Sequence, residues 1–293
     1  MSAIVEQAAD AVAPEPGGLP RRRARRSVTL GIGLTLVGLI VIVAVVSFFW
    51  LPYAQSDTSG TRLEQPSASH WLGTDRFGRD LLTQLMIGAR IALAVGLGSV
   101  AIGAVIGNTL GLLAAFATRW VDDTLSAALD ILIAFPTLLL AMLIVAAQGA
   151  SLGTAIVAIG LAMSAVVARL TRVLAKRVLS QQYVTAARTS GTSWAGIIGR
   201  HILPNIWPTL SVNLALQFGV AVLAEASLSY LGLGAPPPNA SWGRLLQEAQ
   251  GTVSTAPVGA IAPGVALVVL VIGVNLVADG LRDVADPTRR RSR

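Results

Sequence analysis

Residues able to catalyse a reaction or bind a metal are few in this chain and lie far apart. There is no cysteine, and the two histidines, His70 and His201, have no second ligand residue at metal-binding spacing. Thiol catalysis, disulfides and zinc sites are therefore excluded, and no metal site is expected. Lys176, the only lysine, stands between Ala175 and Arg177, so the Gly-Lys-Ser/Thr of a phosphate-binding loop is missing. Any ATP must be bound by another protein.

Two carboxylates, Asp130 and Glu225, fall inside long apolar runs. An ionised carboxylate at the centre of a bilayer costs ~2.5–3.5 kcal/mol, so each requires a partner, a water-filled cavity or a proton. One hypothesis is that they line a translocation path with Asn213 and Gln217, where the ammonium group of a solute would meet them. The alternative is a structural hydrogen bond between helices, or for Asp130 a position at the membrane interface.

The composition predicts a membrane protein. The chain has 293 residues, of which 54% are hydrophobic and 13% charged, whereas soluble domains carry about 25% charged residues. The apolar residues form long uninterrupted runs, which a very apolar soluble bundle does not need. Since a helix needs about 20 apolar residues to cross a bilayer, we expect an all-α polytopic protein with six transmembrane helices.

The apolar runs and the polar segments between them define the expected organisation. The six spans cover residues 28–51, 88–117, 125–147, 152–170, 209–231 and 258–278. The domains are a disordered basic N-terminus at 1–27, a first transmembrane helix at 28–51, an extracytoplasmic segment at 52–85, a five-helix core at 86–281 that contains a cytoplasmic loop at 171–208, and a basic tail at 282–293. Residues 119–123 are expected to form a short polar turn, and Phe135-Pro136 to kink or break the third span.

The distribution of basic residues predicts the orientation. Most of the 22 lysines and arginines lie at the two termini and in the 171–208 loop. Basic residues beside spans mark cytoplasmic segments, so both termini are expected in the cytoplasm, and the charge is not read as a nucleic-acid site. The apolar run at 28–51 is too long for the 7–15-residue core of a signal peptide.

A glycine repeat in the second span predicts close helix packing. Gly103, Gly107 and Gly111 recur at every fourth residue and therefore share one helix face. Small residues at this spacing let a second helix approach closely in lipid. The alternative is that the glycines are incidental.

The 171–208 loop is the most informative segment. Gly191 can end one helix in a left-handed cap, Ser193 can begin a second, and Pro204 is expected to stop that second helix. The result is a short basic helix–turn–helix outside the membrane, suited to insertion into a groove of a partner. An ordinary solvated loop is the alternative, although loops of this length are usually functional.

This segment resembles the cytoplasmic coupling loop of ABC-importer permeases. The family pattern of Ala-Ala-x-x-x-Gly followed by Ile, Leu and Pro is matched by Ala186, Ala187, Gly191, Ile202, Leu203 and Pro204. Thr185 replaces the usual glutamate, which removes one possible salt bridge to the ATPase, and Arg188 lies within the motif. The resemblance implies that the loop docks into the ATPase subunit and transmits its nucleotide-driven closure.

Three further segments are similar to the C-type permease subunit of dipeptide, oligopeptide and nickel importers. They are residues 70–80, 228–243 and 275–287. The resemblance implies the type I ABC-importer permease fold in the bacterial plasma membrane. It also implies a second permease subunit, two ATP-binding subunits that hold ATP and Mg²⁺, and an extracytoplasmic solute-binding protein. No cofactor is expected on this chain.

Other functions remain as alternatives. A stand-alone secondary transporter or channel would often show internal repeats and several buried charges, and a membrane enzyme would need a catalytic cluster. The sequence shows none of these features. Within the family, nickel and glutathione are alternative substrates. Peptides are favoured because no His/Met cluster marks a metal path.

Overall fold

The computed structural model describes residues 28–236 and 238–285. Helices make up most of this part of the chain, and the main irregular stretches are residues 50–80 and 231–241. No β-strand occurs within the described residues, where Thr74 and Asp80 form an isolated bridge. The prediction of an all-α protein is confirmed.

The helices fall into a long and a short set. The long ones are α2 (Val28–Phe49), α3 (Leu81–Phe116), α6 (Leu152–Leu179), α9 (Leu203–Tyr230) and α11 (Val258–Ala285). The short ones are α4 (Arg119–Ala134), α5 (Thr137–Gln148), α7 (Gln182–Thr189), α8 (Trp194–Ile197), the π-helix η2 (Ile198–Ile202), α10 (Trp242–Ala249) and the 3-10 helix η3 (Gln250–Thr252). Five described helices are long and apolar enough to cross a membrane, and the bent pair α4–α5 makes a sixth if it counts as one span.

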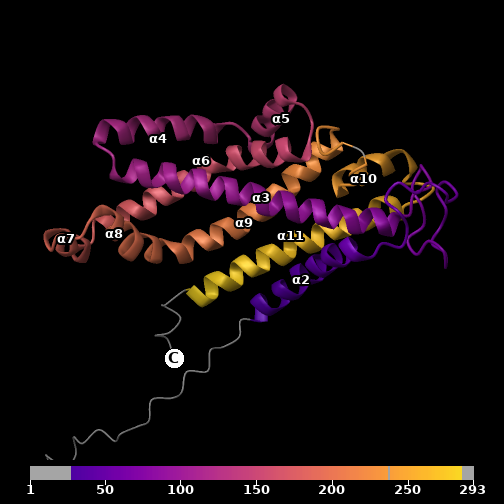
Figure 1. Ribbon diagram of the computed structural model, residues 1–293, viewed down its shortest axis with the longest axis horizontal. Coiled ribbons are helices and arrows are strands. Elements are labelled where there is room, and N and C mark those ends of the chain that lie inside the picture. The colour runs from indigo at the N-terminus through magenta and orange to yellow at the C-terminus, as the bar shows by residue number, and fades with distance from the viewer. Residues whose placement is uncertain (1–27, 237, 286–293) are drawn as a thin grey trace, which may run out of the picture.

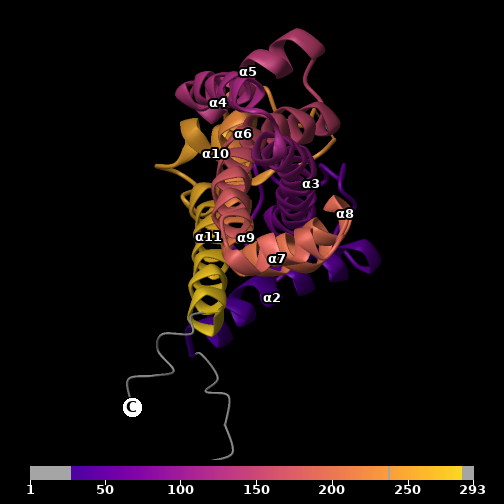
Figure 2. The ribbon, with the colours of Figure 1, turned by 90° about the vertical axis from the view of Figure 1, so that its left-hand side faces the viewer.

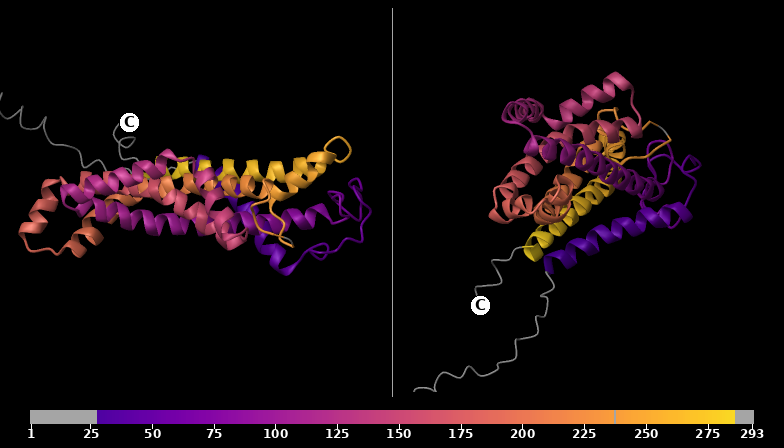
Figure 3. Two further views of the ribbon diagram at one scale, coloured as in Figure 1. Left: turned by 90° about the horizontal axis from the view of Figure 1, so that it is seen from above. Right: turned by 60° about the vertical axis from the view of Figure 1, so that its left-hand side comes forward.

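The long helices form an elongated bundle (Figure 1). Helices α3, α6 and α9 pack against one another, while α2 pairs with α11 along one edge of the bundle. Helices α7 and α8 lie at one end, and residues 50–80 lie with α10 at the other (Figures 1 and 3). Figure 2 views the bundle from the α7–α8 end and shows α4 on the side away from α2. The described chain begins and ends toward the α7–α8 end.

Close contact of α3 with α6 depends on the glycine repeat of α3. A Cβ added to Gly107 would lie 2.6 Å from the Cβ of Val167, and one added to Gly111 would lie 2.5 Å from the carbonyl oxygen of Ala168. Gly103 has a looser fit, since its added Cβ would lie 3.3 Å from a carbonyl oxygen of α6. The stripe therefore faces α6, as a small-residue face does when two helices pack in lipid.

The third span differs from the expectation in its start. Residues 119–123 do not form a polar turn, because α4 begins at Arg119 and the turn shrinks to Ala117 and Thr118. Asp122 stabilises this early start, since an acidic residue in the first turn complements the positive end of the helix dipole. The helix ends at Ala134, and α4 and α5 meet at an angle of 88°. Phe135-Pro136 therefore breaks the span, which is one of the two expected outcomes.

The 171–208 loop is shorter than expected. Helix α6 continues to Leu179 and α9 begins at Leu203. Pro204 does not stop a helix, because it lies in the first turn of α9, where a missing N–H costs little. The preceding π-helix η2 carries the chain from α8 into α9 without interruption. The expected start of the fifth span at residue 209 is therefore too late.

The remaining boundaries shift by a few residues. The first helix ends at Phe49 instead of residue 51, and α3 begins at Leu81, inside the expected extracytoplasmic segment 52–85. Helix α11 continues into the expected tail as far as Ala285. The N-terminal region 1–27 and residues 286–293 lie outside the described residues.

Candidate functional site

The α7–α8 segment, residues 180–202, is anchored to the bundle by an apolar cluster. Val184 of α7 and Ile197 of α8 are fully buried beside Ile202, Ile206 and Ala175. Because Ala175 belongs to α6 and Ile206 to α9, the cluster joins α7 and α8 to the ends of two long helices. The segment is therefore packed on the bundle and does not hang from it as a free loop.

The turn between α7 and α8 has a defined backbone geometry. Gly191 has φ +84°, which glycine adopts without strain. The amide of Thr192 donates to the carbonyl of Ala187, and the amide of Gly191 donates to that of Arg188, both at 3.0 Å. These two bonds make a Schellman motif. Ser193 then caps α8 by accepting from the amide of Gly196 at 3.2 Å.

A groove opens between this turn and the end of α3. It has a volume of about 570 Å³ and is lined by Ala115, Phe116, Leu179, Val184, Thr185, Arg188, Thr189 and Trp194. The ring of Trp194 meets Phe116 edge-on at 5.0 Å between centroids. The guanidinium carbon of Arg188 lies 4.1 Å from the Trp194 centroid. The groove is thus lined by apolar side chains, two threonines and one positive charge.

Most residues of the predicted coupling motif lie on the surface of this segment. The exposed ones are Thr185, Ala186, Arg188, Gly191, Leu203 and Pro204, while Ala187 is half-buried. Ile202 is fully buried in the anchoring cluster, so it positions the segment and cannot contact a partner. The sequence motif therefore combines a surface with the residue that holds that surface in place.

The four residues predicted to line a path are not brought together. Glu225 is 2% exposed and accepts a hydrogen bond from Ser229 at 2.6 Å. Asn213 and Gln217 are half-buried on the same helix, but Asn213 lies about 18 Å along the axis from Glu225, given the rise of an α-helix. Asp130 is exposed on α4 and pairs with Arg169 at 3.3 Å. The bond from Ser229 lies within α9 and is not the expected bond between helices, so a path role for Glu225 stays a prediction.

An ion cluster that sequence reasoning missed joins α4 to α6. The carboxylate of Asp122 accepts from Nε of Arg172 at 2.5 Å and from its terminal nitrogen at 2.8 Å. The ammonium of Lys176 contacts the same carboxylate. Asp122 is 6% exposed, so its carboxylate is shielded from solvent, whereas the side chain of Lys176 is 40% exposed. The available signal was the i, i+4 spacing of Arg172 and Lys176, but their partner lies fifty residues earlier in the chain.

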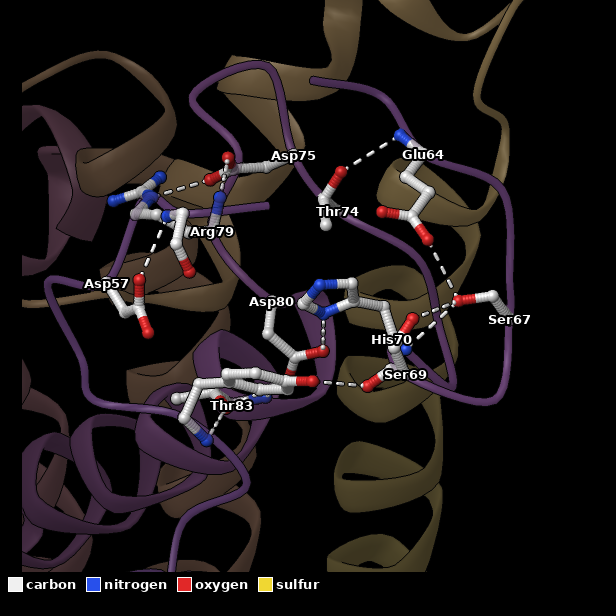
Figure 4. A network of polar contacts seen from close by, with 12 residues as sticks. Asp57, Glu64, Ser67, Ser69, His70, Thr74, Asp75, Arg79, Asp80 and Thr83 are labelled. Carbon is white, nitrogen blue, oxygen red and sulfur yellow. Dashed lines mark hydrogen bonds and ion pairs between the residues drawn. The ribbon is translucent and has the colours of Figure 1, made fainter. Parts of the chain in front are cut away.

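At the other end of the bundle, residues 50–80 form a folded cap segment (Figure 4). Asp80 caps α3 by accepting from the amide and hydroxyl of Thr83, both at 2.8 Å. Its other oxygen lies 3.1 Å from Nδ1 of His70. The His70 ring stacks on Tyr53 with 4.6 Å between centroids. Polar contacts therefore tie the start of α3 to two parts of the cap segment.

A second group of charges joins the cap segment to α10. Arg79 donates to Asp75 at 2.6 Å and to Glu248 of α10 at 2.5 Å. Arg244 completes the group by donating to Glu248 at 2.9 Å. The ion pair of Arg79 with Glu248 connects segments that are 169 residues apart.

An exposed turn of the cap segment holds a further carboxylate. The hydroxyl and amide of Ser59 hold the pKa of Asp57 below its usual value.

Comparison with known proteins assigns the family. The family described as "Binding-protein-dependent transport system inner membrane component" matches residues 107–291. This chain belongs to that family. The match includes the α7–α8 segment and the Asp122 cluster, and the family description agrees with the multi-pass helical fold. The chain is thus an inner-membrane permease component of an ABC transport system and works with an ATPase and a binding protein.

Curated relatives cover nearly the whole chain. The dipeptide transport system permease protein DppC of Alkalihalophilus pseudofirmus is 40% identical over 261 residues, which are 87% of this chain and 86% of the relative. The glutathione transport system permease protein GsiD of Pectobacterium atrosepticum is 39% identical and covers 91% of this chain and 89% of its own length. A putative peptide transport system permease protein of Brucella suis is 40% identical, and the alignment covers 94% of this chain and 93% of the relative.

Solved structures support the fold. An inward-facing structure of the MetNI methionine ABC transporter matches with a TM-score of 0.59 and 23% identity. The alignment covers 69% of this chain and 97% of that chain. A crystal structure of an amino acid ABC transporter with histidines matches with a TM-score of 0.53 and 16% identity. This alignment covers 68% of this chain and 93% of that chain. The prediction of an ABC-importer permease fold is confirmed.

Proposed function

We propose that this chain forms one half of the translocation path of an ATP-driven importer of dipeptides and oligopeptides. The other half is a second, non-identical permease subunit. Two ATP-binding subunits hold ATP and Mg²⁺, and one of them docks on the α7–α8 segment of this chain. An extracytoplasmic binding protein delivers the solute to the opposite end. In this arrangement α7, α8 and both termini face the cytoplasm.

The observation that carries the coupling role is the exposed but rigid turn at Gly191. A Schellman motif, a serine cap and a buried apolar anchor hold the turn in one conformation. A preorganised surface loses little conformational entropy on docking. A rigid attachment to α6 and α9 also lets a displacement of the segment reach the long helices.

The mechanism assigned to this chain is mechanical. Closure of the ATPase subunits on ATP displaces α7 and α8, and the bundle shifts between two packings that open to opposite sides of the membrane. The chain itself forms and breaks no covalent bond. Glu225, Asp130, Asn213 and Gln217 stay candidates for the path, each to be tested in the complete transporter.

Peptides are the preferred substrate class because two of the relatives described above are named for dipeptide or peptide transport. The relative named for glutathione transport makes glutathione the second candidate. Nickel is a weaker alternative, since no group of three or more His, Cys, Asp or Glu able to hold a metal occurs within the described residues.

The test is purification of the complex through a tag on this chain, followed by reconstitution in proteoliposomes. We expect two ATP-binding subunits and a second permease to co-purify, and peptide-loaded binding protein to stimulate ATP hydrolysis and peptide uptake. Labelled glutathione and nickel serve as competing solutes. The variant Ala187→Arg should abolish stimulation. Thr118→Arg, in the exposed turn between α3 and α4 and outside the α7–α8 segment, is the control. Solute uptake by the chain without an ATPase would overturn the proposal.

A further inference from the structure

The ion cluster at Asp122 links the α7–α8 segment to the broken span α4–α5. The anchoring cluster of the segment includes Ala175 of α6. Arg172 and Lys176, which hold Asp122, lie on α6 within one turn of Ala175. The residues that fasten α7 and α8 and those that fasten α4 are therefore on the same two turns of α6.

The two halves of the broken span both contact α6, but through separate apolar clusters. In α4, Leu129 packs on Ala165 and Ala168 of α6, and Asp122 adds the ion cluster. In α5, Ala141 and Val145 belong to a separate apolar cluster with residues of α3, α6 and α9. The chain between the halves turns through 88° at Phe135-Pro136. A displacement of α4 alone would be taken up at this break.

We infer that Asp122 is a positioning residue that makes α4 follow the α7–α8 segment. A docked ATPase that moves α7 and α8 would carry the end of α6, and the ion cluster would transmit that movement to α4. The angle between α4 and α5 would then change, and with it the position of α4 on the side of the helix bundle. This inference rests on the proposed function, because it assigns a step in the same coupling.

Burial and geometry distinguish Asp122 from the other acidic residues of α4. Its carboxylate is held at both oxygens by Arg172 in a bidentate pair, the arrangement that gives charged hydrogen bonds their directionality. Asp123 is next in sequence, but its side chain is 69% exposed and its pair with Arg119 is 4.0 Å long. Asp130 joins the same two helices through Arg169, with both side chains 60% exposed. Exposed pairs of this kind contribute little.

The experiment compares Asp122→Asn with Asp123→Asn in the reconstituted complex. ATP hydrolysis and solute uptake are measured on the same vesicles, so that their ratio reports coupling. We expect Asp122→Asn to lower uptake per ATP by about fivefold or more, the range of a typical coupling energy. Asp123→Asn should stay near the wild-type ratio, and Asp122→Glu should recover part of it.

A second measurement separates positioning from a loss of folding. The chain has no cysteine, so Ala128→Cys on α4 and Gln181→Cys before α7 provide unique sites in it for spin labels. In the wild-type background the distance distribution should shift as one population when ATP is added. With Asp122→Asn it should broaden, while the amount of assembled complex is unchanged.

The outcomes are distinct. An unchanged uptake ratio and an unchanged distance distribution in Asp122→Asn would overturn the inference. An equal fall of assembly, hydrolysis and uptake would also overturn it, since it would assign Asp122 to stability alone. If the wild-type complex shows no ATP-dependent uptake, the proposed function itself fails, and the variants are then not needed to decide it.

Discussion

The guanidinium of Arg188 lies over the ring of Trp194, 4.1 Å from its centroid, across the turn at Gly191. Trp194 also makes an edge-on contact with Phe116 of α3. The two contacts connect the last turn of α7 and the first residue of α8 to the end of a long helix. They give the α7–α8 segment a defined shape on its groove side.

Truncating Trp194 should therefore weaken docking of the ATPase. A cation–π contact contributes about 0.5–1 kcal/mol at an exposed site, and an aromatic pair about 0.5–1.5 kcal/mol. A loss of about 1–2 kcal/mol in preorganisation corresponds to a five- to thirtyfold weaker interaction. The measurement is the affinity of the purified ATPase for Trp194→Ala permease in nanodiscs. Arg200→Ala removes an exposed charge of the same segment and is the control; equal affinities for both variants would contradict the prediction.

Backbone conformation gives a second prediction at Gly191. The φ angle of Gly191, +84°, lies in the left-handed region. A residue other than glycine adopts this conformation at a cost of roughly 1–2 kcal/mol. Gly191→Ala should loosen the turn and lower ATPase stimulation, and Gly191→Pro should abolish it, because proline requires a negative φ. The readout is ATP hydrolysis with loaded binding protein, at equal amounts of assembled complex.

Gly199 provides the matched control for Gly191. An added Cβ meets nothing within 4 Å at either glycine, but Gly199 lies in η2 with no positive φ. Alanine is favoured over glycine in a helix by roughly 0.5–1 kcal/mol, so Gly199→Ala should leave stimulation intact. If Gly199→Ala lost the stimulation of ATP hydrolysis and Gly191→Ala kept it, the turn at Gly191 would not be the part of the segment that coupling requires.

Local signals explain which parts of this site were predictable from sequence. A glycine that needs a positive φ, a serine before a helix and glycines at every fourth residue each act within a few residues. The turn at Gly191, the cap at Ser193 and the packing stripe of α3 were therefore visible as patterns. The start of α4 was not, because Asp122 is stabilised there by Arg172, fifty residues later.

Tertiary context decides the surroundings of the predicted path residues. The burial of Glu225 and the pairing of Asp130 with Arg169 of α6 depend on helix packing that no spacing rule contains. Pro204 was misread for a related reason. Proline stops a helix when it follows several turns, but the π-helix η2 places Pro204 in the first turn of α9.

Helix contact at the glycine stripe predicts a large effect on stability. An alanine Cβ at Gly111 would lie 2.5 Å from a carbonyl oxygen and 2.7 Å from the Cβ of Thr171. Both neighbours are close to the backbone of α6, so the helices must separate, at a cost of about 1–3 kcal/mol. Gly111→Ala should lower the unfolding temperature of the detergent-purified protein. Gly38→Ala, on α2 with nothing within 4 Å, should not; equal melting of both variants would argue against close packing.

The cap segment offers the last prediction, through Asp80. Its carboxylate caps α3 at Thr83 and contacts His70, so Asp80→Ala removes both a helix cap and the partner of a buried imidazole. Loss of a cap costs about 0.5–2 kcal/mol. Amide hydrogen exchange should become faster in residues 50–80 and in the first turn of α3, with α6 unchanged. Asp57→Ala is the control, because the bond that Asp57 accepts from the amide of Ser59 lies in an exposed part of the same segment. Equal protection of residues 50–80 in Asp80→Ala and wild type would mean that apolar contacts alone hold the cap segment on α3.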